Sequence, residues 1–169
     1  MFVLGIDPGL SRCGYGCVTR HGPEFRAVAA GVITTPPAAP LPQRLATLRA
    51  DLHDLIAELR PDAVVLERIF FRANARTAMP VGQASGVALL TAHEHGCVVA
   101  EYTAAEVKLA VTGYGNAPKD QVQAMVVRLL GLTNPPRPPD VADALALGLC
   151  HLGASAWAQE HATMKGSGG

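Results

Sequence analysis

The chain opens with Phe2-Val3-Leu4-Gly5-Ile6-Asp7-Pro8-Gly9, an apolar run that is typical of a first strand and ends on an acid and a turn. A second apolar run, 63–66, ends on Glu67, and Asp140 and Asp143 open a third apolar segment. A carboxylate at the end of a buried element costs free energy unless a cation or hydrogen bonds compensate it. The pattern therefore predicts that three elements bring four carboxylates to one divalent-metal site with oxygen ligands.

Each acid also has a simpler explanation when it is considered alone. Asp7 precedes Pro8-Gly9, a turn sequence, and Asp140 follows two prolines at a position suited to a helix N-cap. Asp143 would then lie near the start of that helix, where the helix dipole favours negative charge. Glu67 has no such capping role at the end of a strand. Taken together, the four acids favour the metal site.

Size and composition indicate a globular chain. Its 169 residues are 49% hydrophobic and 17% charged, which suits one domain with a sizeable core. No apolar run reaches the roughly 18 residues that a membrane span needs, and the N-terminus lacks the basic flank of a signal peptide. We therefore expect a cytoplasmic protein with no membrane contact. The four cysteines do not have the spacing of zinc ligands. The net charge of zero says little about whether the partner is a nucleic acid.

The apolar periodicity predicts an α/β chain. The expected strands are 2–6, 13–20, 25–34, 63–67 and 97–101, and the expected helices are 41–59, 74–94, 103–111, 119–130 and 140–153. Short loops favour antiparallel neighbours, and helical crossovers favour parallel ones. We expect a five-stranded mixed sheet flanked by helices on both faces, with the first and fourth strands adjacent. Residues 1–158 are assigned to a single domain and 159–169 to a flexible tail.

Seven motifs, in order and at compatible spacing, resemble the RuvC family of crossover junction endodeoxyribonucleases. They are Gly5-Ile6-Asp7-Pro8-Gly9, Gly14-Tyr15-Gly16, Leu66-Glu67-Arg68-Ile69-Phe70, Gly82-Gln83-Ala84-Ser85-Gly86, Val107-Lys108, Lys119-Asp120-Gln121-Val122-Gln123 and Asp140-Val141-Ala142-Asp143-Ala144-Leu145-Ala146. The resemblance implies a ribonuclease H-like fold, a homodimer and metal-dependent resolution of four-way (Holliday) DNA junctions in homologous recombination and DNA repair. It also implies cooperation with the RuvA–RuvB branch-migration complex.

The expected chemistry assigns both catalysis and metal binding to Asp7, Glu67, Asp140 and Asp143. Hydrolysis of a DNA phosphodiester is served by two divalent ions, Mg²⁺ or Mn²⁺, that share a bridging carboxylate. Asp7 is the expected bridge, because it ends the central strand. Asp140 and Asp143 are three residues apart, so both can point from one face of a helix. The resembled family varies most at the position of Asp143.

A second group of residues is predicted to contact DNA: Phe70, Phe71, Arg72, Asn74, Arg76, Lys108 and Lys119. The resemblance implies that Phe70 wedges into the junction centre, whereas Phe71 departs from the family pattern. Loop aromatics beside basic residues favour base stacking, although a core role is the commoner fate of phenylalanine. Lys119 opens a helix whose amides could hold a phosphate. The alternative is that both lysines are merely exposed.

Three other functions use similar residues. A ribonuclease H-like nuclease acting on RNA or single strands would share the acids but would not need the Phe70 loop. A sugar kinase or actin-like ATPase would need a second phosphate loop for which the chain has no room. A non-catalytic DNA-structure binder would not need all four acids. Two symmetric cuts need two sites, so we expect a dimer, with small residues of helix 74–94 at its interface: Gly82, Ala84, Ser85, Gly86 and Ala88.

Overall fold

The computed structural model describes the backbone of residues 1–68 and 75–166, and the side chains of these residues except 75–77 and 156–166. The strands are β1 (Phe2–Asp7), β2 (Arg12–His21), β3 (Glu24–Thr34), β4 (Ala63–Glu67) and β5 (Val98–Tyr102). The helices are α1 (Leu41–Leu59), α2 (Ala75–Glu94), α3 (Ala104–Thr112), α4 (Lys119–Leu129) and α5 (Pro139–Gly166).

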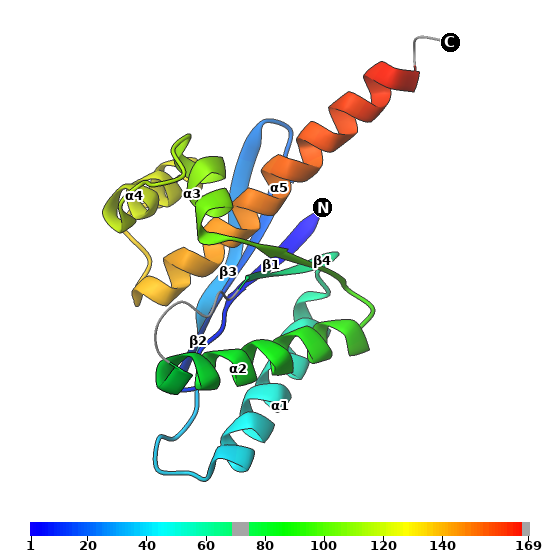
Figure 1. Cartoon of the computed structure of the whole chain (residues 1–169). Helices are drawn as coiled ribbons and strands as arrows, with labels where there is room; N and C mark the ends of the chain where they lie inside the picture. The colour runs from blue at the N-terminus through cyan, green and yellow to red at the C-terminus, as the bar shows by residue number, and fades with distance from the viewer. Residues whose placement is uncertain (69–74, 167–169) are drawn as a thin grey trace.

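The strands form one mixed sheet in the order β3-β2-β1-β4-β5 (Figure 1). Strands β1, β2 and β3 are antiparallel neighbours joined by short turns, whereas β4 and β5 run parallel to β1 after helical crossovers. Helices α1 and α2 cover one face, and α3, α4 and α5 cover the other. The predicted five-stranded mixed sheet with helices on both faces is confirmed, and each element lies within a few residues of its predicted start.

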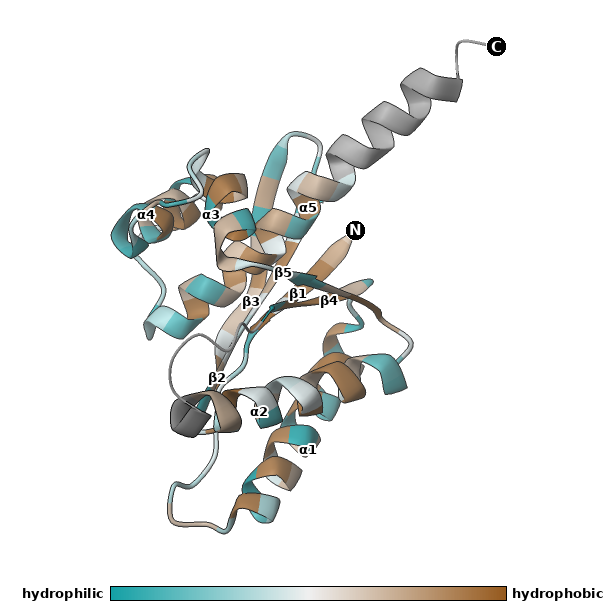
Figure 2. Cartoon of the chain, viewed as in Figure 1, coloured by the Kyte–Doolittle hydropathy of each residue, from teal (hydrophilic) through white to brown (hydrophobic). Residues whose placement is uncertain are grey.

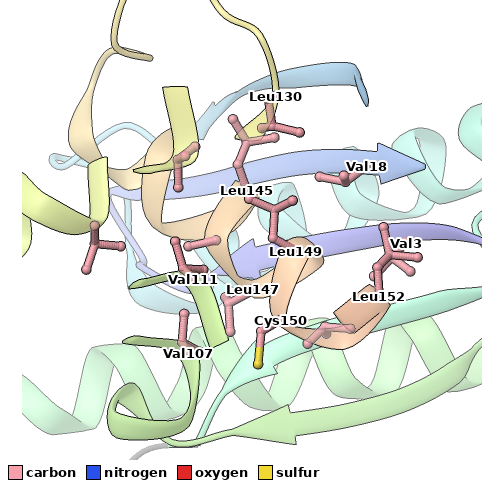
Figure 3. Packing of buried hydrophobic residues seen from close by; sticks show 14 of the residues in the cluster. Val3, Val18, Val107, Val111, Leu130, Leu145, Leu147, Leu149, Cys150 and Leu152 are labelled. Carbon is pink, nitrogen blue, oxygen red and sulfur yellow. The ribbon is translucent and has the colours of Figure 1, made fainter. Parts of the chain in front are cut away.

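Strand β1 is the centre of the fold because it is apolar on both faces. Val3 packs into the core under α3, α4 and α5, which Figure 3 shows from close by, and Leu4 and Ile6 pack into the core over α1 and α2. All three side chains are fully buried. The helices turn their apolar sides toward the sheet, as the colouring in Figure 2 shows. Burial on both faces fixes the register of β1 and hence the position of Asp7.

Glycines let α5 lie directly against the sheet. A Cβ atom at Gly5 would collide with the carbonyl oxygen of Ala144, and one at Gly16 would lie 2.7 Å from the side chain of Leu145. A Cβ at Gly14 would come 2.6 Å from the carbonyl carbon of Asp140. The absence of side chains at these positions therefore sets how closely the start of α5 approaches β1 and β2.

Helix α5 is longer than predicted, because it runs to Gly166 and so includes most of the segment assigned to a tail. The prediction stressed the final Gly-Ser-Gly-Gly, whereas residues 154–165 are rich in alanine and other good helix formers. The flexibility of 159–169 and the single-domain assignment stay predictions. In the part of the chain that was searched for membrane spans, which covers only described residues, no helix is long and apolar enough to cross a bilayer.

Candidate active site

The structure brings the four predicted acids to one end of the sheet. Ile6 of β1 is paired with Leu66 of the parallel strand β4, so Asp7 and Glu67 leave the sheet side by side. Asp7 also faces Gly14 of β2. Asp140 lies in the first turn of α5 against Gly14. These contacts, which are set by sheet register and close packing, bring Asp7, Glu67 and Asp140 from three separate elements to the same end of the sheet.

The electrostatics of the acids show that they lie within reach of one another. Burial, followed by the negative charges of Asp143, Asp140 and Glu67, raises the pKa of Asp7 from 3.8 to about 7. Burial, followed by the charge of Asp143, also raises the pKa of Glu67. The neighbouring charges therefore make Asp7 and Glu67 harder to ionise, which is a cost that a bound cation would remove.

Two basic side chains already neutralise part of this charge. The Lys119 ammonium donates a hydrogen bond to Oδ2 of Asp143 at 2.6 Å, and this bond is the main cause that raises the pKa of Lys119. The Arg12 guanidinium lies 3.4 Å from Oδ2 of Asp140. Arg12 is absent from the predicted site. It begins β2, directly after the turn that follows Asp7, and this closeness to a predicted acid in the sequence is a signal that it lies near the site.

The site contains a buried oxygen without a hydrogen-bond partner. Oδ2 of Asp140 is buried and accepts no hydrogen bond, because Arg12 is near enough for an ion pair but is not aligned to donate. Among the residues searched, all of them described, no three His, Cys, Asp or Glu side chains are arranged to hold a metal ion. Asp143 and Asp140 face Lys119 and Arg12 instead. The all-carboxylate donor set and the unpartnered oxygen nevertheless suit a hard divalent cation.

A pocket of about 210 Å³ opens beside the acids. Its polar lining is Glu67, Asp143, Lys108 and Lys119, and its remaining walls come from apolar side chains of α3, α4 and α5. Helix α3 is held at its start by a capping box between Thr103 and Glu106, whose side chains and backbone amides bond reciprocally. Both predicted lysines thus lie next to the acids, Lys108 in the middle of α3 and Lys119 at the first position of α4.

The other predicted DNA contacts cannot be placed. Phe70, Phe71, Arg72 and Asn74 lie outside the described residues. Arg76 belongs to α2, but its side chain lies outside the described part of the chain. The roles predicted for these five residues stay predictions.

A family model described as "Crossover junction endodeoxyribonuclease RuvC" matches residues 3–151. The chain belongs to the RuvC family. It is therefore an enzyme of the crossover junction endodeoxyribonuclease class. A relative of that name from Moorella thermoacetica is 48% identical over 166 residues, which are 98% of this chain and 99% of the relative.

Two solved structures extend the comparison to the fold. The RuvC structure from Thermus thermophilus is 36% identical, covers 94% of this chain and 97% of its own, and superimposes with a TM-score of 0.86. T. thermophilus RuvC in complex with a Holliday junction substrate is 37% identical with the same TM-score, and it covers 92% of this chain and 94% of its own. The ribonuclease H-like α/β fold expected from the RuvC motifs is thereby confirmed.

In this RuvC-family chain, Asp7 should make the metal-free protein less stable as the pH rises. Its folded pKa of about 7 lies above the ordinary value of 3.8. Between these two values the folded protein binds more protons than the unfolded one, so stability is lost as the pH rises through this window. We expect the melting temperature in EDTA to fall more steeply from pH 5 to pH 8 in the wild type than in Asp7→Asn.

Divalent cations should reverse this trend, because they bind only the ionised carboxylate. Mg²⁺ or Mn²⁺ should raise the melting temperature of the wild type more at pH 8 than at pH 5. Calorimetric melting across this range checks both statements. Parallel profiles for the wild type and Asp7→Asn in EDTA would contradict the placement of Asp7 among like charges.

Proposed function

We propose that this chain resolves four-way DNA junctions by paired symmetric nicks, in a reaction that depends on divalent metal. The observation that carries this proposal is the meeting of four carboxylates from β1, β4 and α5 beside a pocket lined by Lys108 and Lys119. Membership of the RuvC family supplies the substrate class. Recombination and DNA repair are the processes in which such junctions arise.

Asp7, Glu67, Asp140 and Asp143 would hold two ions, Mg²⁺ or Mn²⁺. When bound, such ions activate water and stabilise the charge on the leaving oxygen. The chain's own residues orient the DNA. Lys108 and Lys119 offer their ammonium groups to phosphates at the mouth of the pocket, and the start of α4 adds backbone amides beside Lys119. Lys119 would exchange its bond with Asp143 for a phosphate when the substrate arrives.

The substrate can be tested with three matched nucleic acids. The purified protein is incubated with a synthetic four-way junction, a linear duplex of the same sequence and an RNA–DNA hybrid, each with and without Mg²⁺. We expect cleavage of the junction alone, and only with metal. Preferred cutting of the hybrid would favour a ribonuclease H-like activity on RNA. Metal-independent binding without any cutting would favour a non-catalytic junction binder.

The proposed assembly is a homodimer, with one acid cluster for each of the two symmetric cuts. Helix α2 is the proposed interface, but only some of its small residues can contact a partner subunit. Ala84, Ser85 and Ala88 are buried within the chain, with both alanines in the core against α1 and the sheet. Sequence periodicity alone did not separate the face of α2 that packs on the sheet from the face that points to solvent. The exposed face carries Gly86 and Leu90.

A charge on the exposed face of α2 should disrupt the dimer. Leu90 is 52% exposed, so Leu90→Lys should leave the core of the monomer intact. In a dimer interface the same substitution would bury an unpaired charge. Light scattering should give about twice the 17.6 kDa chain mass for the wild type and the monomer mass for Leu90→Lys. Leu109→Lys, at a similarly exposed position on α3, should remain dimeric. A dimeric Leu90→Lys protein would exclude this face as the interface.

We place the enzyme in the cytoplasm, where it would cooperate with the RuvA–RuvB branch-migration complex on junction DNA. A pull-down of purified RuvA–RuvB on immobilised junctions, with and without this chain, tests the cooperation through changes in the amount of complex retained.

A further inference from the structure

Tyr114 is the one exposed aromatic side chain among the aromatic residues that the structure describes. Its exposed fraction is 57%. Phe2, Tyr15, Phe25 and Tyr102 are each partly buried against one of the two cores. The apolar surface of a large ring is unfavourable in contact with water. Tyr114 belongs to neither of the two cores that the described residues form.

The turn that carries Tyr114 is locked in one conformation. Gly113 ends α3 with a positive φ of 78°, which suits glycine. The Thr112 hydroxyl oxygen lies 3.2 Å from the backbone amide of Tyr114, from which it accepts, and 3.1 Å from the Tyr114 carbonyl oxygen. That same carbonyl oxygen accepts a hydrogen bond from the amide of Ala117. The ring is thus presented to solvent from a fixed backbone, as a binding contact requires.

The turn also lies between the two lysines of the pocket. The Thr112 hydroxyl is 2.8 Å from the carbonyl oxygen of Lys108, one helical turn earlier. Beyond Tyr114 the chain doubles back along α3, since a Cβ at Gly115 would lie 3.5 Å from the carbonyl oxygen of Ala105. The same loop then delivers Lys119 to Asp143. The exposed ring thus lies on the segment that joins Lys108 to Lys119, and both lysines line the pocket beside the acids.

We propose that Tyr114 is a DNA-contacting residue, whose ring packs on the base and sugar of one nucleotide in the strand that meets Lys108 and Lys119. This inference rests on the proposed function. Lysines bind phosphates without regard to the rest of the nucleotide, whereas a flat ring fixes where the nucleotide lies along the strand. Tyr114 would therefore set the position of the strand relative to the carboxylates.

The test is a binding titration with labelled four-way junction at several salt concentrations, in EDTA, so that no cleavage occurs. Tyr114→Ala should weaken binding by about tenfold, the scale of one lost stacking contact. Tyr114→Phe should bind within about twofold of the wild type, because it keeps the ring. The salt dependence of Tyr114→Ala should equal that of the wild type, because the phosphate contacts are unchanged.

Leu109→Ala is the matched control, because Leu109 is 56% exposed on α3, the helix that precedes Tyr114, and this variant should bind like the wild type. Melting curves should be alike for all variants, since Tyr114 is exposed. Wild-type affinity in Tyr114→Ala would overturn this inference alone. Equal loss in Tyr114→Phe and Tyr114→Ala would overturn the role of the ring in favour of the hydroxyl. Failure of the wild type to bind any junction would overturn the proposed function and this inference with it.

Discussion

Asp7→Asn should abolish cleavage of four-way junctions and leave their binding almost unchanged. Asp7 is the acid that interacts with all three others, so its loss removes the central oxygen ligand of the proposed metal site. Metal-ion catalysis contributes several kcal/mol, so we expect the single-turnover rate to fall on the order of a thousandfold or more. Junction affinity rests mainly on lysine and arginine contacts with phosphates, which this substitution leaves in place.

The control for this variant is Asp51→Asn, an exposed acid of α1 on the opposite face of the sheet from α5. It should cleave and bind like the wild type. Cleavage by Asp7→Asn at more than a small fraction of the wild-type rate, with the protein folded, would remove Asp7 from the centre of the reaction.

Gly14→Ala should both destabilise the protein and weaken metal binding. The new Cβ would lie 2.6 Å from the carbonyl carbon of Asp140 and 2.9 Å from its Cβ, so the start of α5 must move away from β2. Forcing a group into a packed contact costs typically about 1–3 kcal/mol. The same displacement moves Asp140 relative to Asp7. We expect a lower melting temperature in EDTA and a smaller rise on addition of Mn²⁺, both measured by calorimetry.

Gly153→Ala separates this effect from the general effect of adding a methyl group to the protein. Gly153 lies in α5, and a Cβ there would meet nothing within 4 Å. The added Cβ should leave Mn²⁺ binding unchanged and should stabilise the helix slightly. If Gly14→Ala bound Mn²⁺ as the wild type does, the close approach of α5 to β2 would not control the position of Asp140.

The sheet was predictable because its strands carry strong local signals. Apolar runs such as 63–66 sit between clear helix and turn signals, and the helical crossovers require β4 to lie parallel to β1. Two acids at the ends of neighbouring parallel strands must then meet, so the positions of Asp7 and Glu67 follow from topology. The start of α5 followed from Pro138-Pro139, which mark where a helix can begin.

The features that sequence did not reveal depend on side-chain contacts between distant segments. The ion pair of Arg12 with Asp140 requires α5 to lie against β2, which no local pattern encodes. The sequence of α2 does not show which side of the helix packs on the sheet. For this reason Ala84 and Ala88 were assigned to a dimer interface, whereas the structure places them in the core. The predicted end of α5 was too early, because the glycines at the end of the chain were given more importance than the helix-forming residues before them.

Mapping the cuts on a four-way junction tests the proposed reaction most directly. Each of the four strands is labelled in turn, the wild-type protein is added in excess, and the reaction is started with Mg²⁺. The two carboxylate sites of a symmetric dimer predict one nick in each of two opposite strands, at equivalent positions, and no nick when EDTA replaces the metal. Nicks at unrelated positions, equal cutting of the matched linear duplex, or cutting in EDTA would contradict a metal-dependent junction resolvase.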